Sequence, residues 1–235
     1  MDIKEILKRY GGKEIDIDSL PQYQRWALNY FSTDRTMVDP NVYITVQLDI
    51  TEAHANYKKH FASTAGASFT AYMIWRIVQT MNDIEPFNYR YLRGRWYHLA
   101  DAPVLVPIAT GKENRFREVL LEKTGKKTWE NFAGEYRFEL NEALDGRGIA
   151  SGSHGENVFD ICSVMFNLPN IQFTSYEHNL HLTQTGRCFW SMGKRYEMGG
   201  KYLMPFAVSL NHSNLDPYML DIFIQKLNQK LVLTN

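Results

Sequence analysis

A histidine and an aspartate four residues apart lie near the end of the chain, in the sequence Asn211-His212-Ser213-Asn214-Leu215-Asp216-Pro217. The segment before them, residues 204–210, is apolar and typical of a buried strand, and the segment after Pro217 has helical spacing. An imidazole titrates near neutral pH, so a histidine at such a turn can remove a proton from a hydroxyl group and deliver it later in a reaction. The pattern therefore indicates general acid–base chemistry at His212. The alternative is a turn histidine without a chemical role.

The elements that must position this turn alternate between strands and helices. β-Branched, alternating residues predict a strand over 43–50 that ends at Thr51, an N-cap for the next helix. Apolar residues at spacings of three and four predict a buried helix over 68–82 with Ser68 as its N-cap. Residues 90–108 are typical of strands with a turn at Arg93-Gly94.

The second half of the chain continues the alternation. Residues 113–142 have helical spacing, residues 150–156 are polar and glycine-rich like a loop, and Asp216-Pro217 supplies an N-cap and a proline for a C-terminal helix. Three further apolar segments, typical of strands, cover residues 158–166, residues 171–176, and residues 189–192 continued past a Gly199-Gly200 turn into residues 202–210. Together these elements predict an α+β fold around a mixed sheet.

The composition restricts the class of protein. The 235 residues are 44% hydrophobic and 14% aromatic, which is enough for one sizeable core, so we expect a single domain over residues 1–235. Lys+Arg and Asp+Glu are equal at 26 each, so no net charge favours nucleic acid or an anionic membrane. No apolar run approaches the roughly 18 residues of a spanning helix, and the start lacks a signal-peptide core. We therefore expect a soluble, cytoplasmic protein.

Metal and disulfide sites are disfavoured. Cys162 and Cys188 are the only cysteines, and they lack CxxC spacing, so we expect two buried free thiols. His178 and His181 have HxxH spacing, but no Asp, Glu or Cys completes a recognisable ligand set around them. We therefore predict no metal site.

Several short motifs occur in a characteristic order along the chain. They are residues 45–51 (TVQLDIT), residues 69–82, Glu85-Pro86-Phe87 with Arg90, Leu168-Pro169 with Phe173-Thr174-Ser175, Met192-Gly193-Lys194, and Leu203-Met204-Pro205 before the histidine motif. From about Ile15 onward the chain resembles the chloramphenicol acetyltransferase family. The resemblance implies a two-layer α+β sandwich around a mixed sheet, acetyl-CoA as co-substrate and antibiotic resistance. The implied acceptor is a small molecule, either chloramphenicol or another hydroxyl or amine. It also implies a homotrimer whose active sites lie between subunits.

The resemblance assigns roles to individual residues. His212 corresponds to the general base, and Lys194 corresponds to a coenzyme A contact. Ser191 stands where the family has a threonine that positions a water near the reaction centre, so it is expected to support the transition state. Asp216 corresponds to a structural aspartate held by an arginine near the N-terminus.

The chain departs from the family at this arginine and at the neighbouring glycine. The arginine position is Gln22, unless Arg25 reaches across from the next turn, and Pro217 replaces the glycine of the motif. Because proline suits the first position of a helix, Asp216 is also expected to act as an N-cap.

The most consequential departure is Phe166, which stands where the family has the serine that donates to the oxyanion. Loss of one such donor costs on the order of 10²–10³ in rate. Asn167 is adjacent and has a donating amide, but along a strand its side chain points to the opposite face.

The acceptor pocket also differs from that of the family. Ile108 replaces an aromatic residue and Asn170 replaces a tryptophan, so Phe166, Ile108 and Asn170 predict a reshaped pocket.

Two functions follow from these residues. The first is an acetyl-CoA-dependent O-acetyltransferase in which His212 deprotonates an acceptor hydroxyl for direct attack on the thioester. The second is a divergent relative that has lost acetyl transfer and binds a small molecule or performs different chemistry in the same interface pocket. An imidazole held by its own backbone carbonyl would favour the first, and one packed against Phe166 would favour the second.

Overall fold

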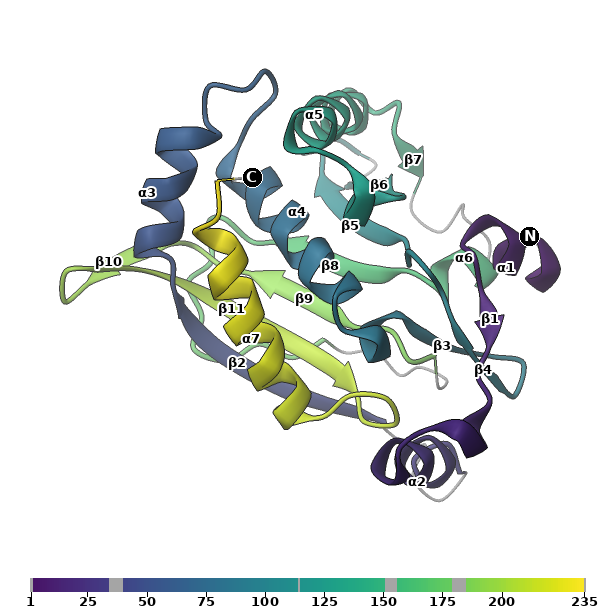
Figure 1. The fold of residues 1–235 in the computed structure, drawn as a ribbon. Helices are drawn as coiled ribbons and strands as arrows, with labels where there is room; N and C mark the ends of the chain where they lie inside the picture. Colours follow the sequence, from purple (N-terminus) through teal and green to yellow (C-terminus); the bar gives the residue numbers. More distant parts are fainter. Residues whose placement is uncertain (1, 34–39, 114, 151–155, 179–184, 235) are drawn as a thin grey trace.

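The structure is a computed structural model that describes residues 2–33, 40–113, 115–150, 156–178 and 185–234 (Figure 1). The α-helices are α1 (Ile3–Arg9), α2 (Gln22–Tyr30), α3 (Thr51–His60), α4 (Phe69–Asn82), α5 (Trp129–Asp145), α6 (Glu156–Phe159) and α7 (Pro217–Leu231). Short 3₁₀ helices cover Ile17–Ser19, Glu85–Asn88 and Thr124–Lys126. Within the described residues, none of the helices has the length and apolar character needed to cross a bilayer.

The strands form one large and one small sheet. They are β1 (Lys13–Glu14), β2 (Asn41–Asp49), β3 (Tyr89–Leu92), β4 (Arg95–His98), β5 (Val104–Ala109), β6 (Phe116–Leu121), β7 (Ile149–Ala150), β8 (Ser163–Asn167), β9 (Phe189–Met192), β10 (Tyr196–Met198) and β11 (Lys201–Asn211). The large sheet has the order β10-β11-β9-β8-β5-β6-β7, with β2 paired to β11, and the small one is β1-β4-β3. Strand β8 runs parallel to both of its neighbours, whereas the other pairs are antiparallel. The predicted α+β fold around a mixed sheet is confirmed.

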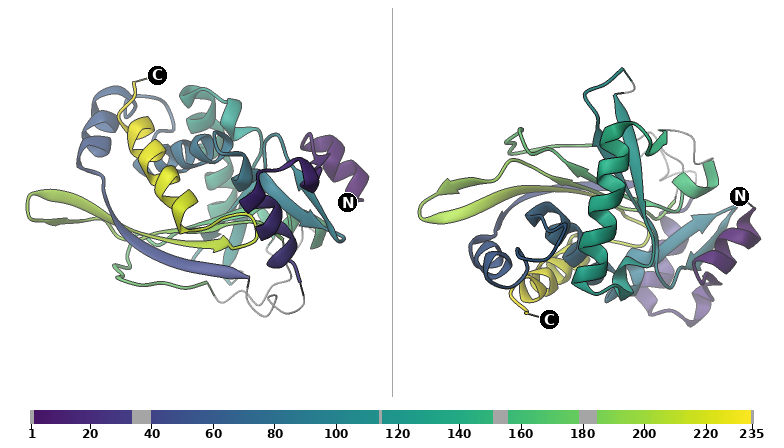
Figure 2. Two further views of the ribbon diagram at one scale, coloured as in Figure 1. Left: turned by 60° about the horizontal axis from the view of Figure 1, so that its bottom comes forward. Right: turned by 90° about the horizontal axis from the view of Figure 1, so that it is seen from above.

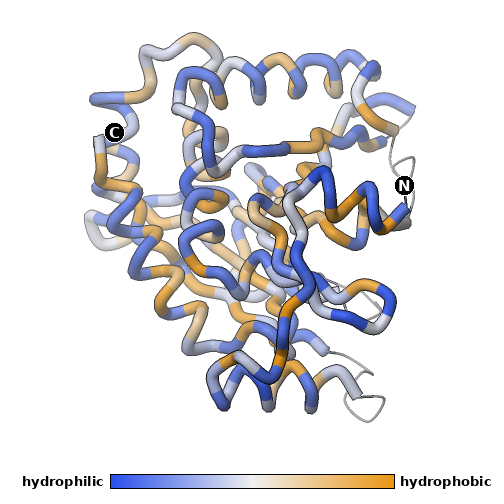
Figure 3. Tube along the Cα trace, turned by 45° about the vertical axis from the view of Figure 1, so that its right-hand side comes forward, coloured by the Kyte–Doolittle hydropathy of each residue, from blue (hydrophilic) through white to orange (hydrophobic). Residues whose placement is uncertain are grey.

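Helices α3, α4 and α7 cover one face of the large sheet, and α5 lies across its β5–β6 end (Figure 2). The core lies between these two layers. Trp190 of β9 packs against Phe223 of α7, with ring centroids 4.7 Å apart, and against Phe206 of β11 at 5.5 Å. Hydrophobic and hydrophilic residues alternate along the C-terminal helix, as Figure 3 shows, because one side faces this core.

Local capping chemistry sets the beginnings of the two central helices. The Ser68 hydroxyl accepts a hydrogen bond from the Ala71 amide at 3.1 Å, and α4 begins at the next residue. The Asp216 carboxylate accepts from the Met219 amide at 2.8 Å, and Pro217 takes the first position of α7. Both predicted N-caps are confirmed, because such caps depend only on residues within one helical turn.

Three local expectations were wrong. Part of the segment with helical spacing forms strand β6, because pairing with β5 and β7 satisfies its backbone hydrogen bonds. Residues 171–176 form no strand and instead follow an irregular path. Thr51 is the first residue of α3 rather than its N-cap, since its hydroxyl bonds to the Asp49 carboxylate at 2.6 Å.

The other face of the large sheet carries serine side chains next to aromatic ones. Ser191 lies opposite Ala207, and Phe189 lies opposite Ser209, in the β9–β11 ladder. Because side chains alternate along a strand, these four share the face that points away from α4 and α7. The irregular segment 168–178 runs over this face: Tyr176 donates its amide to the Thr45 hydroxyl at 3.3 Å.

Candidate active site

The His212 imidazole lies just beyond the end of β11 and is half-buried. Its Nδ1 is 3.2 Å from the backbone oxygen of Leu215. A carbonyl oxygen only accepts hydrogen bonds, so Nδ1 carries a proton, and in the neutral form of the ring Nε2 carries the lone pair. The ring packs against Phe31, with centroids 4.3 Å apart. The imidazole is thus held by the carbonyl three residues on rather than by its own, and its aromatic neighbour is Phe31 rather than Phe166.

Asp216 is held by a tyrosine where the family resemblance implied an arginine. Its carboxylate accepts a hydrogen bond from the Tyr23 hydroxyl of α2, and burial together with this bond raises the pKa of Tyr23. Arg25 does not take the place of the missing arginine, because its guanidinium donates to the backbone oxygen of Asp18 at 3.2 Å. Gln22 is exposed at the first position of α2. Asp216 therefore joins the start of α7 to α2.

The loop that carries His212 is fixed at several further points. The His212 amide donates to the backbone oxygen of Pro40 at 2.7 Å. The Asn214 side-chain amide donates to the backbone oxygens of Pro86 at 2.8 Å and of Gly186 at 3.0 Å. These contacts come from segments far apart in the sequence, so the position of the imidazole depends on the tertiary structure.

Ser191 takes part in a buried hydrogen-bond chain with His178. Its hydroxyl is 2.8 Å from His178 Nε2, and the hydroxyl of Ser209 is 2.8 Å from Nδ1 of the same ring. All three side chains are buried, with exposed fractions of 0% for Ser191, 4% for His178 and 1% for Ser209. One imidazole therefore connects hydroxyls on the neighbouring strands β9 and β11.

Three aromatic rings surround the His178 imidazole. Phe166 stacks on it with centroids 5.1 Å apart and an angle of 29°, Tyr176 meets it edge-on at 5.0 Å, and Phe189 lies 5.6 Å away. Burial lowers the pKa of His178 to about 4, so the ring is neutral at physiological pH. A neutral imidazole has one donor and one acceptor nitrogen, so it donates to one serine and accepts from the other.

Phe166 and Asn167 point to opposite faces of the sheet, as the alternation of a strand predicts. Phe166 is paired with Ser191 in the parallel β8–β9 ladder and shares its face. Asn167 lines a small cavity of about 40 Å³ on the opposite face of the sheet, together with Phe69, Met73 and Gly193. The two residues therefore serve different surfaces.

The remaining candidate residues are Lys194, Asn170 and Ile108. Lys194 is exposed, and its amide donates to the backbone oxygen of Ile171 at 2.8 Å. Asn170 is exposed in the turn after β8, and Ile108 of β5 packs against the core between sheet and helices. Arg195, next to Lys194, places its guanidinium 5.0 Å from the ring of Phe69.

Within one chain, His212 and Ser191 are separated. Ser191 lies opposite Ala207 in the ladder, and His212 follows five residues later, which corresponds to about 16 Å along the strand. A reaction centre that uses both side chains therefore needs a second copy of the chain.

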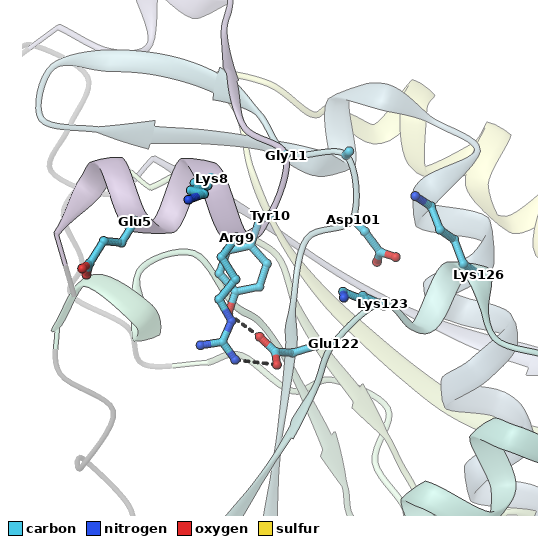
Figure 4. Close-up of a pocket in the computed structure, with 10 residues that line it drawn as sticks. Glu5, Lys8, Arg9, Tyr10, Gly11, Asp101, Glu122, Lys123 and Lys126 are labelled. Carbon is cyan, nitrogen blue, oxygen red and sulfur yellow. Dashed lines mark hydrogen bonds and ion pairs between the residues drawn. The ribbon is translucent and has the colours of Figure 1, made fainter.

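A separate cavity of about 780 Å³ lies between α1 and the loop that follows β6 (Figure 4). Its lining includes Arg9 and Tyr10, which both bond to the Glu122 carboxylate, at 2.6 and 2.7 Å. None of the residues discussed above lines this cavity. It therefore takes no part in the chemistry of either histidine.

The described residues contain no group of three or more His, Cys, Asp or Glu side chains that could hold a metal ion. Both ring nitrogens of His178 are within hydrogen-bond distance of serine hydroxyls, and His181 lies outside the described residues, as does most of the loop predicted over 150–156.

Sequence reasoning missed two residues that organise the site. His178 carried only the HxxH signal, which gives no indication of its serine partners. Tyr23 carried no signal at all, because its partner Asp216 lies at the other end of the chain.

Comparisons with known proteins show what the chain is similar to. A family model described as chloramphenicol acetyltransferase matches residues 13–228. No protein of curated function matches the sequence. Among solved structures, one titled chloramphenicol acetyltransferase has a TM-score of 0.77 at 23% identity, covering 94% of this chain and 99% of its own.

Two further structures have the same fold at lower identity. The catalytic core of a 2-oxoacid dehydrogenase multienzyme complex from Thermoplasma acidophilum has a TM-score of 0.64 at 13% identity and covers 95% of this chain and 100% of its own. A dihydrolipoamide acetyltransferase from Azotobacter vinelandii has a TM-score of 0.63 at 17% identity, with 94% and 91% covered.

Proposed function

Because the chain belongs to the chloramphenicol acetyltransferase family, it is an acyltransferase, and we propose that it moves an acetyl group from acetyl-CoA to a hydroxyl group of a small molecule. In this proposal the acceptor oxygen attacks the thioester carbonyl directly. His212 Nε2 takes the hydroxyl proton as the new C–O bond forms, and returns it to the thiolate when the C–S bond breaks.

The observation that carries the proposal is the state of the His212 ring. Its Nδ1 proton is directed at the Leu215 carbonyl, which leaves the lone pair on Nε2. Only the unprotonated nitrogen of an imidazole acts as a base. Phe31 on one side of the ring and the Leu215 bond on the other hold this orientation.

We propose further that the active site is shared between copies in a homotrimer. The separation of His212 from Ser191 in one chain supports this arrangement. One copy then contributes His212, with Asp216 and Tyr23 as structural support. A second contributes Ser191 as transition-state support, Lys194 as a coenzyme A contact, and Phe166 and Asn170 to the acceptor pocket. Asn167 and Ile108 face the other side of the sheet and are not assigned to this centre.

One observation favours the alternative of a ligand-binding protein without acetyl transfer. Phe166 stands in the position of the oxyanion serine and stacks on His178, so no hydroxyl is present at that point of β8. In that case the pocket still accepts a small molecule, but acetyl-CoA is not turned over.

The test is release of coenzyme A thiol from acetyl-CoA by the purified protein, with chloramphenicol and a panel of other small alcohols as acceptors. We expect turnover with at least one acceptor, and a loss of about 10²–10⁴-fold in His212→Ala and in the closer isostere His212→Gln. Calorimetry with acetyl-CoA alone measures binding separately.

Three outcomes decide between the functions. Turnover that disappears in both His212 variants supports the acetyltransferase. Binding of acetyl-CoA without turnover across the panel supports the alternative. Absence of acetyl-CoA binding overturns the proposal of acetyl-CoA as the donor.

A further inference from the structure

His178 connects Ser191 of β9 to Ser209 of β11, and the acid–base chemistry proposed for His212 does not use it. Its two serine contacts of 2.8 Å run in a line from β11 through the imidazole to β9. Ser191 is fully buried, so its hydroxyl cannot rotate in contact with solvent. The direction of its proton is therefore set by the imidazole.

We propose that His178 is a positioning residue that acts through Ser191: it donates its Nε2 proton to the Ser191 oxygen, so that the Ser191 proton points away from the ring. The inference rests on the proposed function, in which Ser191 supports the transition state. A hydroxyl that donates to the imidazole has no proton left for another acceptor. A hydroxyl that accepts from the imidazole keeps its proton for another acceptor, which in the proposed function belongs to the reaction centre completed by the second copy.

The position of Ser209 completes the argument. When Nε2 carries the proton, Nδ1 has the lone pair and must accept a hydrogen bond. The Ser209 hydroxyl, 2.8 Å away, is the group that donates to it. All hydrogen bonds then run in one direction, from Ser209 to His178 and from His178 to Ser191.

Phe166 has a role in the same unit. Its ring stacks on the imidazole at 5.1 Å, and Tyr176 and Phe189 lie against two further sides. A protonated ring would donate to both serines, so the hydrogen bonds from Ser209 through His178 to Ser191 would no longer run in one direction. The aromatic surroundings disfavour the charged form, because they offer it no counter-ion and exclude water. The phenylalanine that removes a hydroxyl from β8 thus helps to keep the imidazole beside Ser191 neutral.

The first experiment reads the tautomer of His178 directly, by ¹⁵N NMR of the histidine side chains, with His178→Asn to assign the signal. We expect a neutral ring with the proton on Nε2 at pH 7, and a mixture of tautomers in Ser209→Ala, because the donor to Nδ1 is then absent. A wild-type ring with its proton on Nδ1, or a positively charged ring, overturns the proposal. This readout does not depend on activity.

The second experiment measures acetyl transfer in Ser209→Ala, His178→Leu and His178→Asn. We expect kcat to fall about tenfold in Ser209→Ala with the KM for acetyl-CoA unchanged, which corresponds to the loss of one hydrogen bond. We expect kcat to fall further in His178→Leu. In His178→Asn we expect part of the loss in kcat to be recovered, because the asparagine amide still donates a hydrogen bond. Thermal unfolding of each variant separates these effects from loss of folded protein.

The outcomes distinguish the inference from the function on which it rests. A wild-type protein that turns over acetyl-CoA, with unchanged kcat in Ser209→Ala and His178→Leu, overturns the positioning role alone. A wild-type protein without turnover overturns the acetyltransferase, and the tautomer then decides whether the chain Ser209–His178–Ser191 is directed as proposed.

Discussion

At the scale of single residues, the chain contains two histidines in opposite situations. His212 is half-buried, and its Nδ1 lies 3.2 Å from the Leu215 carbonyl oxygen, which is the arrangement that the proposed base requires. His178 is enclosed by aromatic rings and bonded at both nitrogens. The difference comes from burial, because a charged imidazole needs water or a counter-ion around it.

The burial of His178 predicts a dependence of stability on pH. Its pKa is about 4 in the folded chain and near 6.5 when exposed, so the unfolded chain binds more protons in between. The free energy of unfolding should therefore fall as the pH drops from 6.5 to 4, by up to roughly 3 kcal/mol from this residue. Urea denaturation at half-unit steps of pH measures it.

The matched variant for this experiment is His178→Asn, which removes the titrating group. Its stability is expected to be lower at pH 7 and to change less between pH 6.5 and 4 than that of the wild type. Identical pH dependence in the two proteins would show that His178 does not carry the effect.

At the scale of elements, α2 and α7 hold the His212 loop between them. Tyr23 near the start of α2 bonds to Asp216, and Phe31 at its end packs on the imidazole. Asp216 also caps α7 by accepting from the Met219 amide. One carboxylate thus serves both the helix and the loop, in a chain that has glutamine at the position of the family's arginine.

This arrangement predicts the effect of substitutions at Asp216. Asp216→Ala removes the N-cap and is expected to lower the free energy of unfolding by about 1–2 kcal/mol. Asp216→Asn keeps an oxygen for the Met219 amide and should stay within a few tenths of a kcal/mol of the wild type. Tyr23→Phe measures the contribution of the tyrosine bond alone. Urea denaturation of the three variants provides the comparison, and equal stabilities for Asp216→Ala and the wild type would contradict the capping role.

At the scale of the whole molecule, the separation of His212 from Ser191 leads to a test of the shared site. His212→Ala and Ser191→Ala each lack one member of the centre. If one copy supplies the histidine and another the serine, co-refolded mixtures contain interfaces with both intact. At equal amounts, about a quarter of the sites should regain activity.

The measurement is thiol release by the mixture relative to the two variants alone and to co-refolded wild type. Mixing without refolding is the control, and we expect it to show less activity than the co-refolded mixture, because copies must exchange between oligomers to form mixed sites. Activity of the co-refolded mixture no higher than the average of the two variants would contradict a centre shared by His212 and Ser191 of different copies.

The fold could be predicted from the sequence to a large extent, and the site only in part. Helix α4 with its cap at Ser68, strand β2 and the start of α7 depend on spacing and chemistry within a few residues, so they were predicted correctly. Strand β6 was not, because its pairing with β5 and β7 depends on segments on either side of it in the sequence. The hydrogen-bond partners of His178 could not be predicted for the same reason.

The sequence by itself determined the family, the position of the candidate base, the N-caps of α4 and α7, and the opposite orientations of Phe166 and Asn167. These properties follow from the order of short motifs and from the periodicity of helices and strands. Only the tertiary structure decided that Tyr23 holds Asp216, that Phe31 and Leu215 orient His212, and that His178 joins Ser191 to Ser209. The physical reason is that a side-chain hydrogen bond is a short-range interaction in space, and the spatial neighbours of a residue are set by the packing of strands and helices, whatever their separation along the chain.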